Sequence, residues 1–317
     1  MQIPFPLSLH FKGLLILGGG LAIAYLAACL FLFTRQNRFI FLPAALIEVT
    51  PEFFQLPYEE VWLPVPTGGG HSQNIHGWWM PAPRPETGVL LYLHGNGANI
   101  GANVSQAYRF HQLGFSVFLI DYRGYGLSHD KFPTEATVYQ DSQVAWDYLI
   151  HRRQINPDEI FLYGHSLGGA IAINLAVQHP EAAGLIVESS FTSMRDVVDS
   201  RGKFRLFPVD LLLTQRFDSI SKVKSLKLPV LFIHGTADPQ IPAWMSEALF
   251  AATPVLKQLE LIPGADHNHV AEVGGSEYLQ AIESFVTQVR SRQPQLAEGS
   301  SMEGNPASFA EKPPGSR

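Results

Sequence analysis

A five-residue segment constrains the fold of this chain more than any other feature of the sequence. Residues 164–168 read Gly-His-Ser-Leu-Gly; they follow the apolar run 160–163 and precede the small-residue stretch 169–173. This order predicts a tight turn from a strand into a helix, in which a side chain at Gly164 or Gly168 would collide with the neighbouring strand or helix. The hydroxyl of Ser166 is then exposed at the carboxyl edge of a sheet, a placement typical of a nucleophile in covalent catalysis.

The rest of the chain alternates between short apolar runs and helix-like stretches. Six runs are expected to be strands buried on both faces, and five stretches are expected to be helices. This alternation predicts an α/β fold with a mostly parallel sheet and helices on both faces. A hairpin of residues 61–65 and 75–81 adds an antiparallel edge. The expected strands are 88–93, 115–120, 160–163, 184–187, 230–233 and 259–262, and the expected helices are 100–113, 135–151, 167–178, 243–252 and 276–289.

The amino-terminal part of the chain contains a long uncharged segment. No charged residue occurs from 13 to 34, and this segment is long enough for a helix that crosses a bilayer, which needs about 20 residues. It predicts an uncleaved transmembrane anchor, with membrane lipid as its partner. Two alternatives are a cleaved signal peptide and a lipoprotein lipidated at Cys29, which ends the sequence Leu-Ala-Ala-Cys. Lys12 and the amino terminus balance Arg35 and Arg38, so the charges do not assign the membrane side of the remaining chain.

Composition separates the anchor from a main domain and a tail. The segment that follows the anchor contains several prolines. One stretch within the domain has no regular helix or strand pattern and could form a short lid. Near the carboxyl terminus Ser, Pro, Gly, Glu and Gln dominate, which predicts disorder. The expected parts are an amino-terminal flank at 1–12, the anchor at 13–34, a connector at 35–60, the main domain at 61–290 with its lid at 194–228, and a disordered tail at 291–317.

Charge and cysteine content exclude several classes of function. The 317 residues are 46% hydrophobic, which is enough for one large core. The net charge is −6 and no Lys/Arg run occurs, so we expect no nucleic-acid partner. The single cysteine, Cys29, excludes an intrachain disulfide and a cysteine-ligated zinc site. The sequence assigns no oligomeric state.

A serine nucleophile needs a base, and the base needs an acid that orients it. Asp238 follows the expected strand 230–233, and His267 follows the expected strand 259–262, so both belong to loops at the carboxyl edge of the sheet. We therefore predict a triad of Ser166, Asp238 and His267 in the chain order of this fold. Asp266 and His269 are the nearest alternatives in sequence, and together with His267 they could also be interpreted as metal ligands.

The oxyanion formed during such a reaction needs two main-chain donors. The N–H of Leu167 directly follows the nucleophile and lies at a helix amino terminus, where the dipole favours negative charge. The loop at 94–99 reads His-Gly-Asn-Gly-Ala-Asn, and we assign the second donor to the N–H of Asn96. A plain turn is the alternative for this loop. His94, His165 and His234 lie at strand ends and are expected to be structural histidines.

Six motifs together resemble those of the α/β-hydrolase-domain proteins. They are Leu-His-Gly-Asn at 93–96, Asp-Tyr-Arg-Gly-Tyr-Gly at 121–126, the serine turn at 164–168, Glu-Ser-Ser-Phe-Thr-Ser at 188–193, Arg-Phe-Asp-Ser at 216–219 and His-Gly-Thr-Ala-Asp at 234–238. The chain is most similar to the membrane-anchored branch with a short lid, grouped with serine-aminopeptidase-like hydrolases. This resemblance implies an α/β-hydrolase fold, the triad given above, and no cofactor. One departure is visible, because relatives usually have Ala-Gly where this chain has Gly-Ala at 97–98.

The residues and the resemblance together predict a membrane-anchored serine hydrolase. It would cleave carboxylic ester or thioester bonds, including those of acylated lipids or proteins, through an acyl-enzyme at Ser166. A serine peptidase or amidase is the alternative, because it would use the same triad. A non-catalytic binding protein on an α/β-hydrolase fold is the third possibility, although such proteins usually lack a triad member.

Overall fold

The computed structural model describes the chain apart from residues 1–8, 68–69, 84–86, 130 and 303–317, and apart from the side chains of 9–10 and 293–302. An eight-stranded sheet with the order β10-β9-β8-β7-β4-β6-β3-β2 forms its centre. Strands β4 to β10 of this sheet run parallel, and β3 pairs antiparallel with both β6 and β2. The strands are β2 (Glu59–Thr67), β3 (His71–Met80), β4 (Gly88–Leu93), β6 (Phe115–Ile120), β7 (Ile160–His165), β8 (Gly184–Glu188), β9 (Val230–Gly235) and β10 (Lys257–Ile262).

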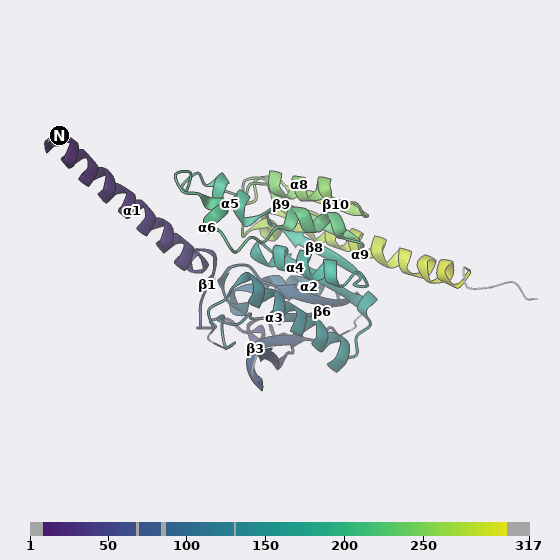
Figure 1. Ribbon diagram of the computed structural model, residues 1–317. Coiled ribbons are helices and arrows are strands. Elements are labelled where there is room, and N and C mark those ends of the chain that lie inside the picture. The colour runs from purple at the N-terminus through teal and green to yellow at the C-terminus, as the bar shows by residue number, and fades with distance from the viewer. Residues whose placement is uncertain (1–8, 68–69, 84–86, 130, 303–317) are drawn as a thin grey trace, which may run out of the picture.

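Helices cover both faces of this sheet (Figure 1). Successive strand side chains point to opposite faces: Leu91 and Leu93 of β4 join the core beneath one set of helices, and Leu90 and Tyr92 join the core beneath the other. The first set comprises α3 (Glu135–Asp147), α4 (Leu167–Gln178) and α8 (Trp244–Ala252), and the second comprises α2 (Val104–Gln112) and α9 (Val270–Met302). The predicted α/β class, with a mostly parallel sheet and an antiparallel edge, is confirmed.

Shorter elements complete the fold. A two-stranded parallel sheet joins β1 (Leu42–Pro43) to β5 (Gly97–Ala98), far apart in sequence. The predicted lid at 194–228 contains α5 (Met194–Ser200), α6 (Val209–Leu212) and α7 (Ser219–Lys222). Single turns of 3₁₀ helix span Pro51–Phe54, Ile100–Asn103, Pro157–Glu159 and Val223–Ser225, and a π-helical turn spans Tyr148–Arg152.

The amino-terminal segment forms one long helix, α1 (Leu9–Ile40), which projects from the body (Figure 1). Residues Phe11–Ile40 have a mean hydropathy of 2.3 and are long and apolar enough to cross a membrane, a property that a signal sequence shares. The helix is continuous through Cys29, which is buried, and it includes the first six residues of the predicted connector. Arg38 lies in its last turn, where a cation suits the helix dipole.

The carboxyl-terminal helix α9 changes direction at Gly275, whose φ of 49° is not helical, and the predicted helix at 276–289 begins directly after it. We expected a disordered tail from residue 291, but α9 continues to Met302. Extension of a formed helix costs far less than its nucleation, so the helix continues into a polar segment that would not start one. The rest of the predicted tail, residues 303–317, lies outside the described residues.

Candidate active site

Ser166 lies in the turn between β7 and α4, at the carboxyl end of a central strand. Its φ of 55° and ψ of −118° fall outside the regions that residues with side chains favour. A Cβ atom at Gly168 would lie 1.9 Å from the carbonyl oxygen of Leu93, and one at Gly164 would lie 2.2 Å from the carbonyl oxygen of Gly168. Since real Cβ atoms never approach this closely, glycine is required on both sides of the strained serine.

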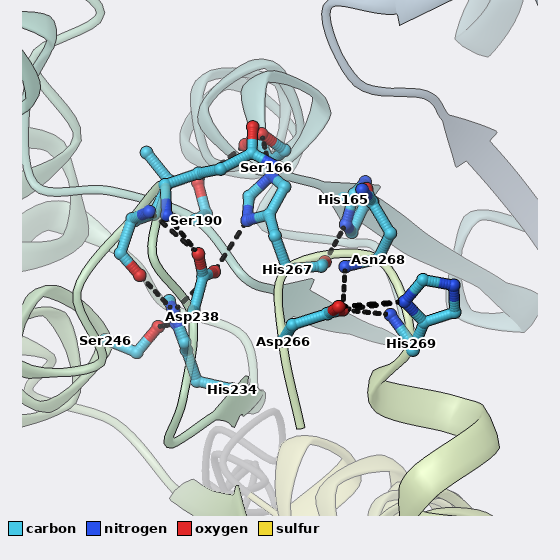
Figure 2. A network of polar contacts seen from close by, with 12 residues as sticks. His165, Ser166, Ser190, His234, Asp238, Ser246, Asp266, His267, Asn268 and His269 are labelled. Atoms are coloured by element: carbon cyan, nitrogen blue, oxygen red, sulfur yellow. Dashed lines mark hydrogen bonds and ion pairs between the residues drawn. The ribbon is translucent and has the colours of Figure 1, made fainter. Parts of the chain in front are cut away.

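A continuous chain of hydrogen bonds joins Ser166, His267 and Asp238 (Figure 2). Nε2 of His267 lies 2.9 Å from Oγ of Ser166, and Nδ1 of His267 lies 2.6 Å from Oδ2 of Asp238. The carboxylate fixes the proton on Nδ1, so Nε2 is the nitrogen that accepts the serine proton. The structure therefore brings together the three residues that the sequence assigned to a triad, and all three are buried.

The environment of Asp238 keeps its carboxyl group ionised. Oδ1 accepts hydrogen bonds from the main-chain N–H groups of Gln240 (2.8 Å) and Ile241 (2.9 Å), and Nε2 of His234 lies 3.2 Å from Oδ2. Burial on its own would raise the pKa of Asp238, but the contacts with His234, His267 and the Ile241 N–H outweigh it. They hold this pKa well below its usual range, so the acid can stabilise a protonated His267.

His234 contacts the triad acid, a role that sequence reasoning missed. Its Nδ1 lies 2.6 Å from Oγ of Ser246, and its Nε2 lies 2.9 Å from the carbonyl oxygen of Ile241. The carbonyl can only accept, so the proton resides on Nε2, between Ile241 and Asp238, and the Ser246 hydroxyl donates to Nδ1. The signal that could have indicated this contact is the position of His234 at the end of β9, four residues before Asp238.

The other two histidines expected to be structural have no direct contact with the reacting serine hydroxyl. Nε2 of His165 lies 3.0 Å from the carbonyl oxygen of His267, and this hydrogen bond stabilises the loop that carries the base. Burial lowers the pKa of His165, so this ring stays neutral near pH 7. His94 is fully buried, and its ring centroid lies 4.5 Å from that of Tyr122.

Asp266 and His269, the alternatives in sequence to the triad members, contact each other rather than Ser166 (Figure 2). Nδ1 of His269 lies 2.8 Å from Oδ1 of Asp266, and the same oxygen accepts from the N–H of Asn268 at 3.0 Å. They are partly exposed residues on either side of the base, in the turn that carries His267. Among the described residues, no three His, Cys, Asp or Glu side chains are grouped as metal ligands would be.

The two assigned oxyanion donors have free N–H groups. In the described part of the chain, neither the N–H of Leu167 nor that of Asn96 donates to a protein acceptor. The Asn96 loop is fixed by the chain that leaves α1: Nδ2 of Asn96 donates to the carbonyl of Ile40 (2.8 Å), and the N–H of Leu42 donates to the carbonyl of Asn96 (2.9 Å). The hydroxyl of Tyr125 donates to the same carbonyl at 2.8 Å. The sequence did not predict this link between anchor and loop.

The departure from the usual loop sequence has a structural consequence. Ala98 has a φ of 60°, which is the left-handed conformation that glycine adopts freely. For alanine this conformation costs about 1–2 kcal/mol. The pairing of β1 with β5 offsets this cost, since the N–H of Ala44 donates to the carbonyl of Ala98 at 2.9 Å. The segment after α1 thus stabilises a strained residue two positions from Asn96.

A polar cavity of about 450 Å³ opens beside Ser166. Its buried lining includes Glu188, the last residue of β8, whose Oε2 accepts hydrogen bonds from the hydroxyls of Tyr163 (3.0 Å) and Tyr278 (2.6 Å). Burial and the Glu188 carboxylate raise the pKa of both tyrosines well above the usual value, so both remain donors. No lysine, arginine or histidine among the described residues forms an ion pair with Glu188, whereas Arg109, at the cavity rim, pairs with Glu272 (3.4 Å).

A second cavity of about 260 Å³ meets the first one at Ser166 and His267. It lies beneath the lid and is lined mostly by apolar side chains. Part of this lining comes from the end of α1 and part from the lid. The apolar residues are Phe39, Ile40, Leu42, Leu167, Phe191, Met194, Val197, Val198, Phe204 and Ile241.

Comparison with known proteins agrees with the fold. Residues 84–209 match the family model described as serine aminopeptidase, S33. The chain is 32% identical to protein bem46 of Schizosaccharomyces pombe, across 75% of this chain and 80% of that protein. It is 26% identical to the α/β hydrolase domain-containing protein WAV2 of Arabidopsis thaliana, across 88% of this chain and 94% of that protein. An esterase of Pyrococcus furiosus has the same fold, with a TM-score of 0.64 at 17% identity over 78% of this chain and 98% of that one. The chain therefore belongs to the α/β-hydrolase family that includes bem46 and WAV2.

Proposed function

We propose that this α/β hydrolase is a membrane-anchored serine hydrolase that cleaves carboxylic ester or thioester bonds through an acyl-enzyme. The observation that carries the proposal is the hydrogen-bonded chain from Ser166 through His267 to Asp238, which starts at a strained serine with two free N–H groups beside it. The apolar length of α1 supports the anchor.

In the proposed mechanism, Oγ of Ser166 attacks the carbonyl carbon while Nε2 of His267 takes the serine proton. The N–H groups of Leu167 and Asn96 stabilise the oxyanion. When the tetrahedral intermediate collapses, the bond to the leaving oxygen or sulfur breaks, and His267 donates the proton to that atom. Water then attacks the acyl-enzyme, His267 takes a proton from this water and returns it to Ser166, and the carboxylic acid leaves.

Labelling with a fluorophosphonate probe tests the nucleophile. We expect the full-length protein in detergent to be labelled, and Ser166→Ala to abolish labelling and to lower ester turnover by roughly 10⁴- to 10⁶-fold. Ser190→Ala is a matched control, because Ser190 is buried nearby and its hydroxyl donates to the carbonyl of Ser166 (2.8 Å). A folded wild-type protein that takes up no label would instead favour a non-catalytic binding function.

The description of the matching family favours an amidase or peptidase as the second candidate. The triad chemistry is the same, so the leaving group decides between the two. A panel of acyl 4-nitrophenyl esters, acyl 4-nitrophenyl thioesters and aminoacyl 4-nitroanilides, whose chromogenic leaving groups differ only in the leaving atom, separates them. We expect kcat/KM for the esters and thioesters to exceed that for the amides; the reverse order would assign the site to amide bonds.

A further inference from the structure

Two apolar cavities lie end to end between the lid and the carboxyl end of α1. The inner one, of about 260 Å³, is the apolar cavity at Ser166, and the outer one measures about 90 Å³. Four side chains line both cavities, so the two are adjacent, and together they are called here the lid–anchor groove. The shared residues are Phe39, Ile40, Val198 and Phe204.

The outer end of the lid–anchor groove lies against α1. Leu32 and Gln36 of α1 line it, and Gln36 also fastens the lid: its Oε1 accepts from the N–H of Thr214 (2.8 Å), and its Nε2 donates to the carbonyl of Leu212 (3.1 Å). Further toward the amino terminus, the ring of Tyr25 stacks on Phe207 with centroids 5.7 Å apart. The lid therefore follows α1 into the range of the candidate membrane span, and the groove opens there.

The lid also exposes apolar side chains on this side of the molecule. Leu206 is 86% exposed and Leu211 is 79% exposed, and both belong to the lid segment that contacts α1 through Tyr25 and Gln36. Large apolar side chains in water are unfavourable, and contact with lipid acyl chains would remove them from it. A bilayer around α1 would therefore meet both leucines and the outer end of the lid–anchor groove.

The outer part of the groove matches a hydrocarbon chain better than a polar occupant, whereas the mostly apolar inner part also includes Asn96, Arg201 and Gln240 near Ser166. Gln36 is the only polar side chain that lines the outer part among the described residues, and its amide is engaged with the lid main chain. A peptide or sugar placed there would lose its hydrogen bonds to water without replacement, whereas a methylene chain has none to lose. The inner end of the groove contacts Ser166, so a chain inside it would lead to the nucleophile.

We propose that the lid–anchor groove binds the long acyl chain of an ester or thioester that resides in the membrane, and that this chain passes from the bilayer along α1 to Ser166. The inference rests on the proposed hydrolase function and names its substrate class. The acyl group that transfers to Ser166 and then to water is the group whose chain occupies the groove, and the leaving oxygen or sulfur departs into the polar cavity.

Bulky substitutions inside the groove test this proposal. The full-length protein in phosphatidylcholine vesicles would be assayed with p-nitrophenyl acetate, butyrate, octanoate and hexadecanoate. Val198→Trp fills the junction of the two cavities, and Leu213→Trp fills only the outer one. Leu206→Trp is the matched control, because it adds a tryptophan to the same lid at an exposed site that lines neither cavity.

We expect Val198→Trp to lower kcat/KM for the octanoyl and hexadecanoyl esters at least tenfold and to leave the acetyl ester within about twofold. We expect Leu213→Trp to affect the hexadecanoyl ester alone, and Leu206→Trp to affect none. Equal losses for all chain lengths in both groove variants, or unchanged hexadecanoyl turnover in both, would overturn the groove as the acyl site. Absence of acetyl and hexadecanoyl turnover in the wild-type protein would instead overturn the hydrolase proposal itself.

Discussion

The two cavities that meet at Ser166 differ in chemistry although they share the nucleophile and the base. The polar cavity ends at the buried carboxylate of Glu188, whose partners are two tyrosine hydroxyls and no cation among the described residues. The lid–anchor groove ends beside α1 and is lined mostly by aliphatic and aromatic side chains, with Gln36 in its outer part and Asn96, Arg201 and Gln240 in its inner part. One serine therefore faces a hydrogen-bonding site in one direction and a hydrocarbon site in the other.

This difference suits an amphiphilic substrate and gives it one orientation. Each methylene placed in the groove contributes about 0.8 kcal/mol relative to water, and the same methylene in the polar cavity would displace water from Glu188 and its neighbours. A polar leaving group placed in the groove would lose its hydrogen bonds. Substitutions can therefore be sorted by whether they act on the shared centre, on the polar cavity or on the groove.

Asp238→Asn should give the largest effect, because it acts on the shared centre. Asparagine can donate to Nδ1 of His267 and thereby favour the tautomer in which Nε2 cannot accept the serine proton. We expect kcat to fall about 10⁴-fold, by the same factor for acetyl and hexadecanoyl esters and for charged and neutral leaving groups. Initial rates with this set of substrates measure the effect.

Asp266, which directly precedes His267 in the sequence, supplies the control for Asp238→Asn. Asp266→Asn changes a carboxylate in the same loop region as His267, yet Asp266 contacts His269 rather than the triad. Activity in this variant should stay near that of the wild-type protein. A loss in Asp238→Asn that differed by more than tenfold between short and long esters would mean that the two cavities do not share one catalytic centre.

Glu188→Gln should act on the polar cavity alone. Glutamine keeps an acceptor for Tyr163 and Tyr278 but removes the buried negative charge. We expect kcat/KM for butyrylcholine, whose leaving group is cationic, to fall roughly tenfold, equivalent to about 1.4 kcal/mol. The neutral isostere 3,3-dimethylbutyl butyrate should change less than twofold.

Glu272→Gln is the matched comparison for that variant. Glu272 lines the same cavity, but it is half exposed and already paired with Arg109, so solvent screens its charge and the effect on butyrylcholine should be small. If Glu188→Gln slowed both butyrate esters equally, Glu188 would act only by joining α9 to the sheet through Tyr278.

The shared centre could be predicted from the sequence, and the two cavities could not. A Cβ atom at Gly164 would collide with Gly168 inside the turn, and one at Gly168 would collide with the end of the neighbouring strand β4, so the two glycines and the serine between them indicate the turn in the sequence. Asp238 and His267 follow parallel strands, and the carboxyl ends of such strands meet at one edge of the sheet. Local pattern and fold class are enough for both inferences.

The features that distinguish the cavities depend on contacts between distant segments. Two residues of β1 pair with two of β5, a pattern too short to recognise in a sequence. The hydroxyl of Tyr278 reaches Glu188 only because α9 packs against the sheet, and the groove exists only because the irregular lid lies on α1. Helix α9 also continues through residues that composition assigned to a disordered tail, because composition does not register the helix that precedes them.

Gln36→Ala should give the smallest effect, and it acts on the groove alone. The variant removes the hydrogen bonds between Gln36 and lid residues 212, 214 and 215, while the hydrogen bond from Tyr25 to Leu206 and the apolar contacts between the lid and α1 remain. At roughly 1 kcal/mol for a typical hydrogen bond, we expect the lid to spend more time displaced. Turnover of the hexadecanoyl ester should then fall about threefold, and turnover of the acetyl ester should not change.

Gln178→Ala, at the exposed end of α4, controls for loss of a glutamine amide and should leave both rates unchanged. The same pair of substrates in vesicles and in detergent sharpens the comparison further. If the lid directs acyl chains from the bilayer, the threefold loss of hexadecanoyl turnover should be present in vesicles. It should be smaller in detergent, where the acyl chain no longer has to leave a bilayer along α1. Equal losses of hexadecanoyl turnover in both media would mean that Gln36 shapes the groove without directing passage from the membrane. No loss in either medium would mean that the remaining contacts, such as that of Tyr25 with Phe207, suffice to hold the lid on α1.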